Sequence, residues 1–243
     1  MDQKQKPDFD VISVGAGFAG LALVHYLREA GMSIRVFDRA SDIGGTWTWN
    51  RYPGAMCDVE SYVYMPLCEE LGYVPTEKYA HQPELLAHSQ AIMRHYDLYP
   101  SACLGAEVES LTWLEDLSRW RITTTRGDTI LARFAIVNFG VFSHPKLPAV
   151  PGLSSFHGEM FHTSRWNYDL TGGSTVGGLS GLQGKRVAII GTGATAVQVV
   201  PHLAAHATEL YVFQRTPSTI DVRNNFKTTK AYVPFISFFL FSS

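Results

Sequence analysis

Apolar runs alternate with helical patterns along the first part of the chain. Residues 9–14 form a short apolar run suited to a buried parallel strand, and residues 18–30 carry apolar side chains at helical spacing. A second strand-like run covers residues 33–38. Farther along, the same criteria predict one helix and then three strands, over residues 83–96, 106–114, 119–125 and 134–137.

The opening pattern returns near the end of the chain. Residues 186–190 read as a strand, a turn and a helix to about Ala205 follow, and residues 209–213 read as another strand. A strand-turn-helix-strand unit that occurs twice, far apart in one chain, is typical of tandem dinucleotide-binding folds. We therefore predict an α/β fold with two dinucleotide-binding, Rossmann-like units in tandem, both of them incomplete.

The first of the two turns contains Gly15, Gly17 and Gly20 in the spacing G-x-G-x-x-G. Gly15 allows the tight turn, Gly17 lets the backbone approach a pyrophosphate, and Gly20 lets the helix pack closely on the strand. Asp38 ends the second strand, where a carboxylate accepts hydrogen bonds from ribose hydroxyls and repels a 2′-phosphate. This turn predicts a bound dinucleotide but does not decide between FAD and NAD.

The second turn, Gly191-x-Gly193-x-x-Ala196, keeps the spacing with alanine in the third place. The strand after it leads into Arg215 and not into an acid. A guanidinium fork binds phosphate bidentately, so this turn favours NADPH over NADH. An arginine that only lies in a surface loop is the plainer alternative.

Two segments between these turns follow neither a helical nor a strand period. Residues 44–58 combine glycines, tryptophans and one acid, and we expect a loop there that holds the flat ring of a flavin. Phe156, Gly158, His162 and Trp166 form an F-x-G-x-x-x-H-x-x-x-W pattern, which suits a hinge between two nucleotide domains. A purely structural, hydrogen-bonded role for His162 is the alternative.

Composition and charge narrow the classes of function. Of the 243 residues, 46% are apolar and 17% are charged, as in a soluble globular protein. The net charge is −2 and the 20 basic residues are scattered, which argues against a nucleic-acid partner. The polar start without an apolar signal core predicts a cytoplasmic protein, and no apolar run has the roughly 20 residues that a membrane span needs.

Metal and disulfide sites are not expected. Cys57, Cys68 and Cys103 fit neither a disulfide framework nor a zinc site. His202 and His206 have a spacing that can share a metal on a helix, but no third ligand accompanies them.

The two glycine turns, the block from Gly44 to Asp58 and the pattern from Phe156 to Trp166 together resemble type I Baeyer-Villiger monooxygenases. The amino-acid sequence is most similar to the fungal branch of this family, which acts on secondary metabolites such as meroterpenoids. The resemblance implies a flavoenzyme in which NADPH reduces FAD and one atom of O2 is inserted beside a ketone carbonyl, giving an ester or a lactone. The implied partners are O2 and a small-molecule ketone of polyketide or terpenoid type.

The resemblance also implies roles for individual residues. Asp58 is expected beside the flavin and the nicotinamide as the catalytic residue of this chain, where it would orient a catalytic arginine. The residues implied for FAD are Gly15, Gly17, Gly20, Asp38, Thr46, Trp47, Thr48, Trp49 and Tyr64. The residues implied for NADPH are Met56, Cys57, Asp58, Gly191, Thr192, Gly193, Ala194, Thr195, Ala196, Val197, Arg215 and Thr216. His162 would couple the movements of the two domains.

The implied domain organisation has four parts. These are the N-terminal part of an FAD-binding domain (1–145), a hinge with the fingerprint and a glycine-rich linker (146–185), the first βαβ unit of an NADP-binding domain (186–225) and an atypical apolar tail (226–243).

The sequence departs from the family pattern in three respects. Family members are much longer, and the part that completes both nucleotide domains, including the catalytic arginine, is expected beyond Ser243. Asn167 stands where the fingerprint usually has proline or aspartate, and Phe139 is expected to crowd the flavin. Two alternatives therefore stay open beside the monooxygenase: a truncated, non-catalytic remnant of such an enzyme, and an N- or S-oxygenating flavoprotein.

Overall fold

The computed structural model of the chain describes residues 6–140, 142 and 144–229. Most of the predicted apolar tail, residues 230–243, lies outside the described residues. The chain divides into two compact units. The first unit contains residues 1–49, 65–72 and 85–143, and the second contains residues 50–64, 73–84 and 144–243.

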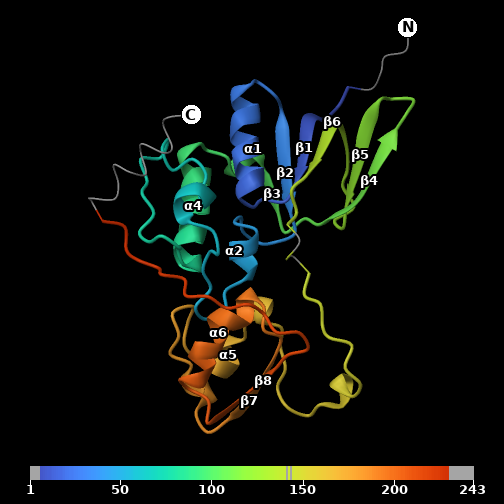
Figure 1. Ribbon diagram of the computed structural model, residues 1–243. Helices are drawn as coiled ribbons and strands as arrows, with labels where there is room; N and C mark the ends of the chain where they lie inside the picture. Colours follow the sequence, from blue (N-terminus) through green and yellow to red (C-terminus); the bar gives the residue numbers. More distant parts are fainter. Residues whose placement is uncertain (1–5, 141, 143, 230–243) are drawn as a thin grey trace. The chain divides into compact units, whose positions relative to one another are not determined.

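A six-stranded mixed sheet forms the frame of the first unit, in the strand order β3-β2-β1-β6-β5-β4 (Figure 1). Four neighbouring strands run parallel, namely β3 (Ala102–Leu104), β2 (Ile34–Asp38), β1 (Phe9–Val14) and β6 (Thr129–Val137). Two antiparallel strands, β5 (Arg119–Thr124) and β4 (Val108–Leu114), extend the sheet beyond β6. The order 3-2-1 of the parallel strands is that of half a Rossmann fold.

Both faces of the central strand β1 are buried. Val11 belongs to one hydrophobic cluster and its neighbour Ile12 to another, because successive side chains of a strand point to opposite faces. Burial on both sides explains why two successive residues of the strand, Val11 and Ile12, are both apolar and do not alternate with polar ones.

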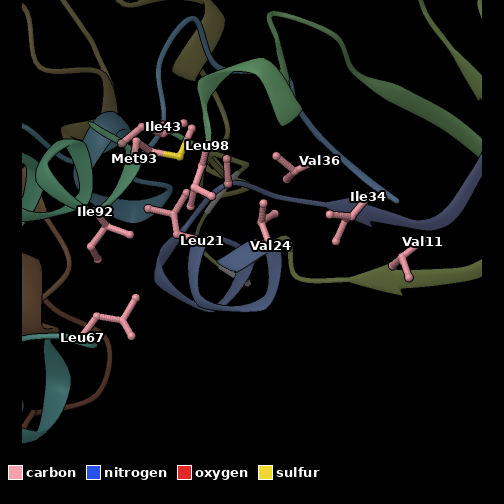
Figure 2. Packing of buried hydrophobic residues seen from close by; sticks show 11 residues of the cluster. Val11, Leu21, Val24, Ile34, Val36, Ile43, Leu67, Ile92, Met93 and Leu98 are labelled. Carbon is pink, nitrogen blue, oxygen red and sulfur yellow. The ribbon is translucent and has the colours of Figure 1, made fainter. Parts of the chain in front are cut away.

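The helix α1 (Phe18–Glu29) covers one face of the sheet and supplies the centre of the larger cluster. Figure 2 shows Leu21 and Val24 of α1 gathered with side chains of β2 and of α4 (Gln82–His95). Leu21 is completely buried, and full burial of such a side chain stabilises the fold by about 2 kcal/mol. The apolar spacing that predicted the helix is therefore the pattern that fixes it to the sheet.

The second unit contains a two-stranded parallel sheet, β7 (Arg186–Ile190) and β8 (Glu209–Phe213), connected by α6 (Ala194–Ala204). Its hydrophobic cluster includes Val199 and Leu203 of α6 together with Tyr52 and Leu179. Shorter helical segments complete the chain: α2 (Thr46–Trp49), α3 (Ser61–Tyr64), α5 (Tyr168–Thr171) and the 3-10 turns at Tyr99–Ser101, Leu153–Ser155, Thr163–Arg165 and Ser180–Leu182.

The predicted α/β fold with Rossmann-like parallel strands is confirmed, and most of the predicted elements are present within a few residues of their expected ends. The expectation of a plain loop over residues 44–58 is wrong in part, because Thr46–Trp49 forms a helical turn. The short strand β3 was not predicted, and β6 begins earlier than its apolar run suggested. Among the described residues, no helix is both long and apolar enough to cross a bilayer.

Candidate functional site

The first glycine turn is a place where backbone packs directly on backbone. A Cβ built on Gly20 would lie 2.1 Å from the carbonyl oxygen of Gly15, and one built on Gly15 would lie 2.7 Å from the carbonyl carbon of Asn138. Gly15 also has a φ of +108°, a backbone conformation that residues with a side chain rarely adopt. Both glycines are therefore required by the fold itself.

Gly17 is different, because the space beside it is open. A Cβ built there would have Gly45 Cα at 3.7 Å as its nearest neighbour. Gly17 is the N-cap of α1 and offers no side chain to its first N–H groups. An N-terminal helix end without a side-chain cap is a place where an anion binds. The fold does not need glycine at this position, but a ligand pressed against the backbone would.

Asp38 holds the turn from the other side. Its Oδ2 accepts a hydrogen bond from Ala16 N at 2.7 Å, and its Oδ1 accepts one from Ala40 N at 2.8 Å. The residue is only 9% exposed. Each carboxylate oxygen keeps a second lone pair after these bonds, so the side chain can fix the glycine turn and still accept a hydrogen bond from a ribose hydroxyl.

The glycines of the tryptophan-rich block dock onto the same turn. Gly44 N donates to Ala16 O at 2.8 Å, and a Cβ on Gly45 would lie 2.8 Å from Gly17 Cα. The helical turn α2 follows directly and is anchored by buried Trp47, by the Thr48 hydroxyl on Ile43 O and by Arg39 over the Trp49 ring. The structure thus brings Thr46, Trp47, Thr48 and Trp49 to the turn that the sequence predicted for the same cofactor.

The residues that follow β6 lie beside the first glycine turn. Asn138 Nδ2 donates to Ser13 Oγ at 2.9 Å, and Asn138 N donates to Val14 O at 2.7 Å. The neighbouring Phe139 is 61% exposed. The expected crowding of a flavin by Phe139 stays a prediction.

The second glycine turn has the same backbone form with less crowding. Gly191 has a φ of +110°, and its N–H donates to Phe213 O at 2.8 Å. Among the described residues, a Cβ on Gly191 or Gly193 would meet no atom within 4 Å. Gly193 caps α6, and Ala196 is buried where the fingerprint allows alanine. The other residues predicted for this site begin α6 or flank it: Thr192, Ala194, Thr195 and Val197.

Arg215 and Thr216 follow β8 and are exposed. Because β7 and β8 are parallel, with Ile190 paired to Phe213, their ends meet at one sheet edge. Arg215 therefore leaves the sheet at the same edge as Gly191, where a guanidinium can meet a phosphate.

Asp58 lies in a polar cluster of the second unit whose hub is Gln198 of α6. Gln198 Oε1 accepts hydrogen bonds from Tyr52 OH at 3.0 Å and from Met56 N at 3.1 Å. Gln198 Nε2 donates to Asp58 Oδ1 at 3.1 Å and to Met56 O at 3.3 Å. One amide side chain thus connects the helix that follows the second glycine turn to the segment that carries Met56, Cys57 and Asp58.

Arg223 is the second partner of Asp58. Its Nη2 forms an ion pair with Asp58 Oδ1, and its Nη1 donates to Cys57 O at 2.7 Å. Sequence reasoning found neither Gln198 nor Arg223, because both are remote from Asp58 in the chain. The only available signal was the position of Gln198 one helical turn into α6, on the side shared with Ala194.

Burial changes the acidity of two groups in this cluster. Burial raises the pKa of Tyr52, and it raises the pKa of the Cys57 thiol from 9.0 to about 11. Cys57 is only 3% exposed. Both side chains are therefore neutral at physiological pH and act here as packing and hydrogen-bonding groups.

Tyr64 and the fingerprint residues also belong to the second unit. Tyr64 ends α3 and is half-buried. Trp166 Nε1 donates to Thr171 Oγ1 at 3.0 Å, while Phe156 is exposed and its ring fills the space beside Gly158. These contacts give the fingerprint a local structure, and its hinge role stays a prediction.

His162 acts as a helix cap. Its Nδ1 accepts from Ser164 N at 3.2 Å and contacts Ser164 Oγ at 2.8 Å. Burial, and then the charge of Arg165, lower the pKa of His162. A neutral ring with a free Nδ1 lone pair is the form that can accept a backbone N–H, so the shift and the cap agree.

Comparisons with known proteins show what this arrangement is similar to. A model described as an NAD(P)-binding Rossmann-like domain matches residues 14–70. Neopentalenolactone D synthase of Streptomyces avermitilis is 57% identical over 220 residues, which are 90% of this chain and 37% of that protein. Baeyer-Villiger monooxygenase ATR8 of Stachybotrys chlorohalonatus is 51% identical over 218 residues, 89% of this chain and 35% of that protein. Over most of its length, this chain is therefore similar to proteins named Baeyer-Villiger monooxygenases.

A solved structure supports the same relationship. The complex of OTEMO with FAD and NADP superimposes with a TM-score of 0.87 at 34% identity, covering 96% of this chain and 44% of that one. The chain therefore spans less than half the length of these three proteins.

The unequal surroundings of the glycines lead to a stability prediction. Replacing Gly20 by alanine should lower the free energy of unfolding by about 3 kcal/mol, because its methyl group would overlap the Gly15 carbonyl. Gly17→Ala should change it by less than about 0.5 kcal/mol, since the added methyl group has room. Urea denaturation followed by circular dichroism measures both, and equal losses in the two variants would contradict the assignment.

The raised pKa of Cys57 leads to a prediction about its reactivity. Only the thiolate reacts with iodoacetamide, so at pH 8 a pKa of about 11 leaves about one hundredth of the thiolate that an ordinary cysteine has. The alkylation rate of Cys57 should keep rising with pH up to about 11. Peptide mass spectrometry between pH 7 and 10 tests this, with the urea-unfolded chain as control. A plateau by pH 9 in the folded chain would show that burial does not control this thiol.

Proposed function

We propose that this chain is a flavin-dependent monooxygenase of the Baeyer-Villiger type, with FAD at the first glycine turn and NADPH at the second. When bound, these cofactors supply the redox chemistry that inserts one oxygen atom from O2 beside a ketone carbonyl. The product would be an ester or a lactone. A ketone of secondary metabolism, of polyketide or terpenoid type, is the proposed substrate class.

One observation carries this proposal. Each of the two units places a glycine turn and an uncapped helix start at the carboxyl end of a parallel strand pair. The backbone N–H groups at such a helix start bind the pyrophosphate of a dinucleotide. Two turns of this kind fit an enzyme that moves electrons from one dinucleotide to another.

The residues around the turns support the order of the cofactors. At the first turn, Asp38 favours a free ribose, and the open space at Gly17 suits a pyrophosphate. The docked Thr46–Trp49 turn supplies aromatic side chains for a flat ring. At the second turn, exposed Arg215 favours the 2′-phosphate of NADPH. The OTEMO structure contains FAD and NADP, in line with this pair.

Asp58 is the proposed catalytic residue of this chain. Its carboxylate is held by Gln198 and Arg223 and stays about half exposed, with 51% of the side chain accessible. A fixed and accessible carboxylate can orient a cation or a nicotinamide amide beside a reacting flavin. We propose that the fingerprint from Phe156 to Trp166 couples the domains during the reaction.

The cofactor assignment is tested on the purified full chain, reconstituted with FAD and freed of excess flavin. We expect stoichiometric flavin absorbance, bleaching of that absorbance by NADPH without oxygen, and an ester or lactone from at least some members of a ketone panel by mass spectrometry. Gly17→Ala, which should fold normally, should bind FAD at least about tenfold more weakly.

The outcomes separate the open alternatives. A colourless wild-type chain would overturn the proposal. Bound flavin that NADPH does not reduce would favour a non-catalytic remnant. Reduction followed by oxygenation of amines or sulfides, with ketones untouched, would favour the N- or S-oxygenating flavoprotein.

The choice of NADPH is tested by Arg215→Ala. Removing the guanidinium should weaken NADPH binding by about tenfold and leave NADH binding unchanged, because only NADPH carries the 2′-phosphate. Titration of intrinsic tryptophan fluorescence with each nucleotide measures this. A loss of equal size for both nucleotides would contradict a phosphate-binding role for Arg215.

A further inference from the structure

Residues 223–228, which we call the clasp, run beside two other segments of the second unit. Lys78 N donates to Phe226 O at 3.0 Å, and Thr228 N donates to Thr76 O at 2.8 Å. The Thr228 hydroxyl also contacts Tyr62 OH at 2.8 Å. The clasp is thus attached to α3 and to the segment around residues 76–78.

A residue in the left-handed conformation separates two anchored side chains of the clasp. Asn224 has a φ of +49°, a left-handed conformation that asparagine tolerates better than most residues. On one side of it, Arg223 reaches the carbonyl of Cys57 and the carboxylate of Asp58. On the other side, Asn225 Oδ1 accepts from Tyr79 N at 2.9 Å and its Nδ2 donates to Glu77 Oε2 at 2.7 Å. The bonds of Asn225 therefore hold the backbone of the clasp in place next to Arg223, the residue that contacts Asp58.

The guanidinium of Arg223 bonds to two consecutive residues, Cys57 and Asp58. One nitrogen donates to Cys57 O at 2.7 Å and the other pairs with Asp58 Oδ1, while the group lies 5.3 Å from the centre of the Tyr79 ring. A planar fork suits these two acceptors, since each is met by a different nitrogen held in a fixed geometry, whereas a lysine ammonium is a compact point charge. These two bonds fix both the peptide between Cys57 and Asp58 and the Asp58 carboxylate.

Both hydrogen bonds to the Asp58 carboxylate reach the same oxygen atom. Gln198 Nε2 and Arg223 Nη2 both meet Oδ1. From the residues that the structure describes, Oδ2 receives no hydrogen bond, and the side chain is half exposed. One oxygen is anchored, and no described residue occupies the lone pairs of the other.

We infer that Arg223 is a positioning residue that holds Asp58 in the orientation in which its second carboxylate oxygen can serve the reaction. This inference rests on the proposed function, since it takes the catalytic role of Asp58 from there. An ion pair as exposed as this one contributes little to folding stability. Its main effect is therefore on the orientation and mobility of the segment around Asp58.

The test uses the full chain reconstituted with FAD, four single variants and the double variant that combines Arg223→Met with Asp58→Asn. Arg223→Met removes the fork, Arg223→Lys keeps the charge without the fork, and Asp58→Asn removes the anchored charge. The matched control is Arg133→Met, because Arg133 forms a surface pair with Asp10 at 3.0 Å in the first unit. FAD retention is measured for each variant and should stay at the wild-type level.

The first readout does not depend on turnover. Alkylation of Cys57 by iodoacetamide, followed by peptide mass spectrometry, reports how well the Cys57–Asp58 peptide is held. The rate is taken per thiolate from the pH profile of alkylation, because the charge of Arg223 lowers the pKa of Cys57 and its loss changes the thiolate fraction. We expect Arg223→Met to raise this rate by about fivefold, because a charge-assisted bond to the Cys57 carbonyl is lost. Arg223→Lys should give a smaller rise, and Cys103 in the first unit should react at an unchanged rate in every variant.

The second readout is the rate at which NADPH reduces the bound flavin. Arg223→Met and Asp58→Asn should slow this step by similar factors, and the double variant should be no more than about twofold slower than Asp58→Asn alone. Losses that multiply in the double variant, or a wild-type rate in Arg223→Met, would show that Arg223 does not act through Asp58.

The two readouts separate this inference from the proposed function. If the wild-type chain takes no electrons from NADPH, the proposed function fails, and an unchanged Cys57 alkylation rate in Arg223→Met would still refute the positioning role. If Arg223→Met does not fold, as judged by its melting curve, Arg223→Lys takes its place. In that case a wild-type rate of Cys57 alkylation in Arg223→Lys refutes the inference.

Discussion

Direct contact between two stretches of backbone organises the first unit. Gly20 at the start of α1 lies so close to the carbonyl of Gly15 that no side chain fits between them. This approach brings the N-terminus of α1 to the end of β1, and the carboxylate of Asp38 then ties the turn to the end of β2. Gly45 packs on Gly17 in the same way, so the tryptophan-rich turn is carried to the same place. The result is a candidate cofactor site made mostly of main chain.

The second unit uses the same fingerprint with a different physical basis. Gly191 needs glycine for its positive φ, but a Cβ there meets no described atom within 4 Å. Ala196 takes the third place because a methyl group fits the cluster that it joins. Order at this site comes from polar side chains instead, above all from Gln198, which links α6 to Tyr52, Met56 and Asp58. One sequence motif is thus supported by packing in one unit and by hydrogen bonds in the other.

The cluster around Asp58 combines three distant parts of the chain. Asp58 itself follows the tryptophan-rich block, Gln198 lies on α6 and Arg223 lies beyond β8. Burial keeps the neighbouring Cys57 and Tyr52 neutral, so the carboxylate and the guanidinium are the charges that face each other there. An accessible acid whose orientation is set by two partners is well suited to a role that depends on direction and not on acidity.

Most of the strands, the long helices and both glycine turns could be predicted from the sequence, because these follow from short-range spacing: apolar period, the need for positive φ and the close approach that only glycine allows. The resemblance to a known family also assigned Thr46, Trp47, Thr48 and Trp49 to the cofactor of the first turn. Only the folded chain shows that Asp38 bonds Ala16 and Ala40, that Thr46–Trp49 forms a helical turn, and that Gln198 and Arg223 meet Asp58. These contacts join residues whose separation along the chain carries no period. Their partners are selected by how the packed elements bring polar groups into reach, and a linear pattern does not contain that information.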